Sequence, residues 1–150
     1  MADSTIIVGI DDSPSSRAAL SWAARLARAT RWNLRAVHVL EWPVGLAEEA
    51  AGEPAEVVQL PDSAVEKAFR HGMRRVFDEV DPLSEWQLHF AEGDTAQMLI
   101  RLAAEAELLV IGSREHDTSG RSLAGGISHY CISHATSPVV VVPVEHLSTT

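Results

Sequence analysis

The stretch TIIVGIDDSPSSRAALSWAARLARAT, residues 5–30, has the pattern of a buried strand followed at once by a helix. Residues 5–11 are mainly apolar and β-branched, which is typical of a strand covered on both faces in a parallel sheet. Ser13 and Pro14 then suit the cap and the first position of a helix. Apolar residues recur at helical spacing through the rest of the stretch. The stretch therefore predicts a strand, a short turn and a long amphipathic helix.

Strands and helices continue to alternate along the chain. Patterning predicts strands over residues 34–42, 85–93, 107–113 and 137–144, and helices over residues 62–81, 96–107 and 123–136. Polar residues alternate with apolar ones in residues 85–93, which indicates a strand nearer to an edge. Residues 43–61 mix proline, glycine and acidic residues and predict a loop. The order predicts an α/β fold, a single open, mainly parallel five-stranded Rossmann-like sheet with helices on both faces.

The composition is that of one soluble globular domain. The chain has 150 residues, of which 46% are hydrophobic and 22% charged, so it can bury a sizeable core. We expect a single domain over residues 1–150, with a core from about residue 5 to 143 and short tails at 1–4 and 144–150. The formal net charge of −9 disfavours nucleic acid and anionic membranes as partners.

The ends of the chain and its single cysteine favour a cytoplasmic location. Residues 1–16 lack the basic and then long apolar regions of a secretory signal, and no apolar run is long enough to cross a bilayer. Cys131 cannot form an intramolecular disulfide, which is consistent with a reducing compartment. Its neighbours predict a buried helical thiol rather than a reactive one.

The expected ligand site lies where the strands end. In open parallel sheets, ligands bind outside the carboxyl ends of the strands, where the strand order reverses. The candidate strand ends are Asp11, the region after Val39, and Gly112. Gly112 lies at the start of the glycine-rich segment 111–128. Gly120 and Gly125 have the glycine spacing of the P-loop motif G-x-x-x-x-G-K-[ST], but the lysine and the hydroxyl residue do not follow them. The dinucleotide-binding motif G-x-G-x-x-G does not follow the first strand. A P-loop hydrolase and a standard dinucleotide enzyme are therefore both disfavoured.

The glycine-rich segment resembles that of the universal stress protein family. In the nucleotide-binding branch of this family, the fourth strand ends in a glycine, and a second glycine follows after two intervening residues. After nine further residues come a third glycine and then a serine or threonine. Gly112 and Gly125 match, whereas Glu115 replaces the second glycine and Gly126 the hydroxyl residue. The stretches IIVGIDDSPSSRAAL, AVHVLEW and SPVVVVP also look like the family's first strand and helix, second strand and last strand, so the resemblance covers nearly the whole chain.

The resemblance implies a binding site for ATP or another adenine nucleotide, with any Mg²⁺ carried by its phosphates. It places Gly9 beneath the nucleotide, Asp11 beside the ribose or phosphates, Val39 beside the adenine, Ile111 and Gly112 beneath the ribose and phosphates, and the backbone amides of Gly125, Gly126 and Ile127 at the phosphates. A helix start at the last three residues would favour an anion. Arg114 could offset the charge of Glu115.

The resemblance further implies a cytoplasmic stress-response protein that senses or buffers adenine nucleotide and signals through partners. At most slow ATP hydrolysis is expected, since no general base or catalytic lysine is evident. A terminal strand of valines is an exposed pairing edge. Pairing with a second copy would protect it, and the family resemblance also implies such a dimer; we therefore expect a homodimer through Val139, Val140, Val141 and Val142. The alternative is a dimeric interaction protein of the same fold that has lost nucleotide binding, which Glu115 and Gly126 motivate.

The remaining candidate groups have ordinary structural explanations. Asp11 and Asp12 are adjacent, so we expect one carboxylate near the site and the other capping or solvated. No dedicated metal site is indicated, because a zinc site at Cys131 and His134 would need further ligands. Among the histidines, only His116 in the glycine-rich segment is a plausible site residue.

Overall fold

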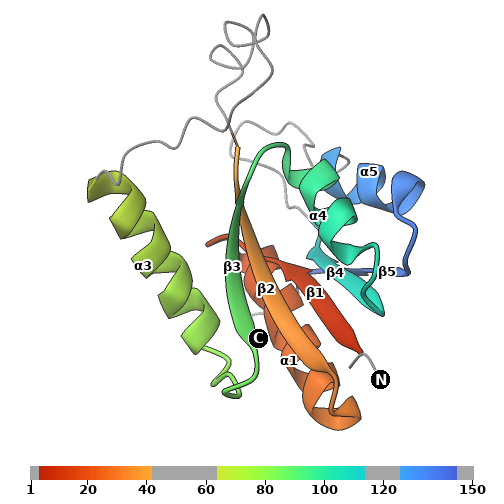
Figure 1. Cartoon of the computed structure of the whole chain (residues 1–150), viewed down its shortest axis with the longest axis horizontal. Helices are drawn as coiled ribbons and strands as arrows, with labels where there is room; N and C mark the ends of the chain where they lie inside the picture. Colours follow the sequence, from red (N-terminus) through yellow and green to blue (C-terminus); the bar gives the residue numbers. More distant parts are fainter. Residues whose placement is uncertain (1–3, 42–63, 114–125, 145–150) are drawn as a thin grey trace, which may run out of the picture.

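A computed structural model of the chain describes residues 4–41, 64–113 and 126–144, which form an open five-stranded parallel sheet with helices on both faces (Figure 1). The elements are β1 (Thr5–Gly9), α1 (Pro14–Thr30), β2 (Asn33–Leu40), α3 (Ala64–Asp78), β3 (Gln87–Glu92), α4 (Thr95–Ala103), β4 (Leu108–Gly112), α5 (Gly126–His134) and β5 (Val139–Val142). The strand order is β3-β2-β1-β4-β5, and every neighbouring pair is parallel. The predicted fold class is confirmed, including the place of β3 at an edge.

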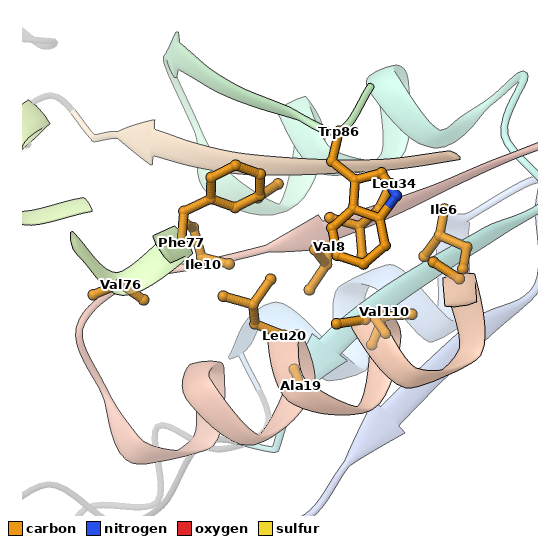
Figure 2. Close-up of a cluster of buried hydrophobic side chains, with 14 of the residues drawn as sticks. Ile6, Val8, Ile10, Ala19, Leu20, Leu34, Val76, Phe77, Trp86 and Val110 are labelled. Carbon is orange, nitrogen blue, oxygen red and sulfur yellow. The ribbon is translucent and has the colours of Figure 1, made fainter. Parts of the chain in front are cut away.

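The sheet separates two hydrophobic clusters. Strand side chains alternate between the faces, so Ile6 and Val8 of β1 join the cluster under α1 and α3, whereas Ile7 joins the cluster under α4 and α5. Figure 2 shows the first cluster, where Leu20 of α1 and Phe77 of α3 gather over the sheet. Both sides of the central strands are therefore buried, as their continuous apolar sequence predicts.

Side-chain caps begin α1 and α4. The Ser13 hydroxyl accepts a hydrogen bond from the Ser16 amide at 3.2 Å, and Pro14 follows it. The Asp94 carboxylate accepts one from the Gln97 amide at 2.9 Å and caps α4. The predicted cap at Ser13 is confirmed, and Asp94 has the same role at the start of α4.

Several predicted elements run past the observed ones, and hydrogen bonds explain the difference for two of them. The first strand ends at Gly9 rather than Asp11, because the Asp11 amide donates to the Ser16 hydroxyl at 2.6 Å and leaves the ladder. The helix predicted to run to residue 107 ends at Ala103, and the Ala104 amide then bonds to the Arg101 carbonyl at 3.4 Å. Within the described ranges, no helix combines the length and the apolar character needed to cross a membrane.

Candidate functional site

A cavity of about 410 Å³ opens at the carboxyl ends of β1, β2 and β4. Chain order reverses here, because β2 lies on one side of β1 and β4 on the other. The walls come from three strand ends, the starts of α1, α4 and α5, and one side chain of α3. The lining residues are Gly9, Ile10, Asp11, Ser13, Ser15, Ser16, Val37, His38, Val39, Leu40, Glu41, Phe69, Thr95, Leu99, Ile111, Gly112, Ile127 and Ser128.

The cavity brings together most of the site residues predicted from the sequence. The predicted residues that line it are Gly9, Asp11, Val39, Ile111, Gly112 and Ile127. Gly126 begins α5 but is not a lining residue. Arg114 and Gly125 lie outside the described residues, as do Glu115 and His116. The contribution of each residue to binding stays a prediction.

Two of these glycines also have a packing role within the protein. A Cβ atom on Gly112 would lie 2.4 Å from the Ser15 carbonyl oxygen, so the end of β4 packs directly against the first turn of α1. A Cβ atom on Gly9 would lie 2.9 Å from Leu99 Cδ1 of α4. The absence of a side chain at these two glycines therefore lets helices pack closely on both faces of the sheet, independently of any ligand.

The Asp11 turn is held by hydrogen bonds to the first turn of α1. The Ser16 hydroxyl accepts from the Asp11 amide and donates to the Asp11 carbonyl at 3.1 Å. The Asp11 carboxylate accepts from the Ser13 amide at 2.7 Å. Asp12 is exposed, so the two adjacent carboxylates divide as expected, one at the site and one in solvent.

Two aromatic residues of the wall were missed by the sequence analysis. His38 of β2 is buried and lines the cavity, whereas the sequence predicted His116 as the plausible site histidine. Phe69 of α3 also lines the cavity and is 48% exposed. A histidine inside the buried run AVHVL was the available signal for the first of these residues.

The charged side chains among the described lining residues, Asp11 and Glu41, are both acidic. A Glu41 carboxylate oxygen accepts from the Thr95 amide at 3.4 Å, at the start of α4. This part of the cavity therefore offers carboxylate oxygens to the hydroxyl or amino groups of a ligand. A phosphate is better placed near α5, whose first turn adds Ile127 and Ser128 to the wall.

Cys131 is not a reactive site residue. It is fully buried on α5, and burial, with a smaller contribution from the Asp94 charge, raises the pKa of its thiol to about 11. His134 is exposed, with Nδ1 3.0 Å from the Tyr130 carbonyl oxygen. The prediction of a buried helical thiol is confirmed. Across the described ranges, no three His, Cys, Asp or Glu side chains are grouped so that they could hold a metal ion.

Sequence comparison gives a match to the universal stress protein family over residues 4–143. A universal stress protein of Mycolicibacterium smegmatis is 31% identical over 140 residues, which cover 91% of this chain and 47% of that protein. The chain spans about half the length of the curated relatives that it matches.

Solved structures share the fold. A universal stress protein in complex with cAMP has a TM-score of 0.63 and 21% identity, covering 95% of this chain and 98% of the other. The universal stress protein from Archaeoglobus fulgidus in complex with dAMP has a TM-score of 0.62 and 20% identity, covering 95% of this chain and 99% of the other. At these identities the likeness concerns the fold.

Proposed function

The chain belongs to the universal stress protein family, and from this premise we propose that its cavity binds an adenine nucleotide. The observation that carries the proposal is the position of the cavity at the reversal of strand order, where open parallel sheets bind ligands. Its volume of about 410 Å³ lies within the range of about 300–1,000 Å³ typical of small-molecule sites. Proteins of this fold have been solved with cAMP and dAMP, which supports the ligand class.

The lining residues suit the parts of a nucleotide in different ways. Val39 and Ile111 provide apolar surface for the base and sugar, and Asp11 provides a carboxylate that can accept from a ribose hydroxyl. The phosphates would lie toward Ile127, at the N-terminal end of α5, where the helix dipole favours an anion. The roles of the predicted site residues remain part of this proposal.

Binding of ATP is expected to depend on Mg²⁺. Asp11 and Glu41 place negative charge in the cavity, and a triphosphate adds more. A divalent cation carried by the phosphates would reduce the repulsion between these groups. We therefore expect Mg²⁺ to strengthen ATP binding more than AMP binding.

Calorimetry on protein stripped of bound ligand tests the proposal with ATP, ADP, AMP and cAMP, each with and without Mg²⁺. Asp11→Asn keeps a side-chain oxygen that accepts from the Ser13 amide but removes the negative charge. We expect this variant to bind AMP about tenfold or more weakly than the wild-type chain, because a hydrogen bond to a charged group contributes about 1.5–3 kcal/mol. Asp12→Asn, at the exposed neighbour, is the matched control and should keep the wild-type affinity. Absence of binding heat and of any melting shift with all four nucleotides would contradict the proposal.

We also propose, from family membership, that nucleotide occupancy serves a stress response through partner proteins. The alternative is an interaction protein of the same fold without nucleotide, which the Glu115 and Gly126 replacements favour. The same calorimetric series separates the two, because only the first requires the wild-type chain to bind a nucleotide.

A homodimer through Val139, Val140, Val141 and Val142 remains part of the proposal. The Pro138 carbonyl accepts from the Leu109 amide of β4, and the Val142 carbonyl accepts from the Ser113 amide just after it. In a parallel ladder, Val139 and Val141 therefore direct their backbone groups outward. Val141→Pro removes an outward N–H and should yield monomers, whereas the control Val141→Ala should remain dimeric. Light scattering at micromolar concentration measures this, and a monomeric wild-type chain would contradict the proposal.

A further inference from the structure

His38 is held in one orientation at the cavity wall. Its Nδ1 lies 2.8 Å from the Ile10 carbonyl oxygen, and a carbonyl can only accept, so Nδ1 carries the proton. The Phe90 ring packs edge-on against the imidazole, with centroids 6.3 Å apart and planes at 77°. The Ile10 amide in turn donates to the Val37 carbonyl at 2.8 Å, which ties the ends of β1 and β2 together. The imidazole is thus fixed by two strands.

This orientation leaves the second ring nitrogen as a hydrogen-bond acceptor. With the proton on Nδ1, Nε2 of the neutral imidazole carries a lone pair and no hydrogen. His38 Nε2 has no hydrogen-bond partner within the described part of the chain, and it is not among the fully buried polar atoms that lack one. Nε2 therefore retains contact with solvent, and the cavity is the space that His38 lines.

Phe69 adds apolar surface to the same wall. Its ring lies 5.9 Å from the His38 ring between centroids, and the two planes differ by 21°. A flat heterocycle that is hydrogen-bonded to Nε2 in the imidazole plane would therefore lie nearly parallel to the Phe69 ring. Parallel, offset rings are a favourable aromatic arrangement, and the half-exposed Phe69 ring has surface left to cover.

We infer that His38 and Phe69 form a base-recognition subsite, in which His38 Nε2 accepts from the exocyclic amino group of adenine while Phe69 stacks on the ring. This inference rests on the proposed function and adds selectivity to it. A purine with an oxo group at the same carbon would place its oxo oxygen, a hydrogen-bond acceptor, against the acceptor His38 Nε2. The subsite therefore selects 6-aminopurines over 6-oxopurines.

The test compares the dissociation constants of AMP and IMP, which differ in this substituent, by calorimetry at pH 8. The wild-type chain should prefer AMP by about tenfold, because a site built around one hydrogen bond discriminates against a ligand that cannot make it. His38→Asn keeps a side-chain N–H for the Ile10 carbonyl and removes Nε2, so the preference should fall to within about twofold. Phe69→Leu should weaken both ligands by a similar factor and keep the preference. His71→Asn, an exposed histidine of α3 outside the lining, is the matched control.

Each outcome has a distinct meaning, and thermal melting of every variant separates binding from folding. Equal affinity of the wild-type chain for AMP and IMP overturns this inference and leaves the proposed function standing. An unchanged preference in folded His38→Asn overturns it as well, because a merely structural histidine would not set the ratio. Failure of the wild-type chain to bind either nucleotide overturns the proposed function together with this inference.

Discussion

Gly112→Ala lowers the free energy of unfolding by about 3 kcal/mol or more, at or above the upper end of the usual cost of overpacking. The added Cβ would lie 2.4 Å from the oxygen and 2.5 Å from the carbon of the Ser15 carbonyl, which are backbone atoms in the first turn of α1. Relief requires α1 to move away from the sheet, and α1 contributes Ala19, Leu20 and Ala23 to the core. Urea unfolding followed by circular dichroism measures the loss.

The matched control for this change is Gly9→Ala, at the other strand end of the cavity. Its Cβ would meet the end of the Leu99 side chain at 2.9 Å, and that side chain can rotate away. We expect a loss of less than about 1 kcal/mol, as for tolerated changes of core volume. Equal losses for the two alanine variants would show that contact with the α1 backbone does not govern Gly112.

Phe77→Ala lowers the free energy of unfolding by about 3–5 kcal/mol, the usual cost of removing a buried aromatic ring. Phe77 is 1% exposed and joins α3 to the cluster that also holds Val8 and Leu20. Its loss leaves a void between α3 and the sheet that neighbouring side chains can fill only in part. The shift in the urea midpoint, at an unchanged denaturant dependence, measures this cost.

Phe69→Ala, two turns earlier in α3, is the internal control for the second change. The side chain is 48% exposed, so its removal takes little area out of the core, and we expect a loss of less than about 1 kcal/mol. A large loss at Phe69 together with a small loss at Phe77 would mean that α3 is rotated about its axis so that Phe69, rather than Phe77, faces the core. Comparison of the two variants thus tests the orientation of this helix.

Local signals in the sequence predicted the fold well. Ser13 and Asp94 cap helices through amides three residues away, so their neighbours alone are enough to identify them. The alternating polar residues Gln87 and His89 placed β3 at an edge, because one face of an edge strand is less covered. In each case the deciding contact or exposure follows from the immediate sequence.

The parts of the site that escaped prediction depend on contacts between distant segments. His38 acquires its orientation from Ile10, and Phe69 reaches the cavity wall from α3, for which the sequence predicted a helix but no site residue. The predicted role of Gly112 beneath the ribose and phosphates stays a prediction, but its close packing against Ser15, nearly a hundred residues earlier, was not predicted. Periodicity shows which face of an element is apolar, but it does not show which residues meet at its end.

The cavity at the end of the sheet touches both hydrophobic layers. His38 and Phe69 approach it from the side of α1 and α3, whereas Val39, Leu99 and Ile111 belong to the layer under α4 and α5. A ligand bound in this cavity would contact both hydrophobic layers, so its binding free energy would oppose their separation. We therefore expect the proposed nucleotide to stabilise both layers together.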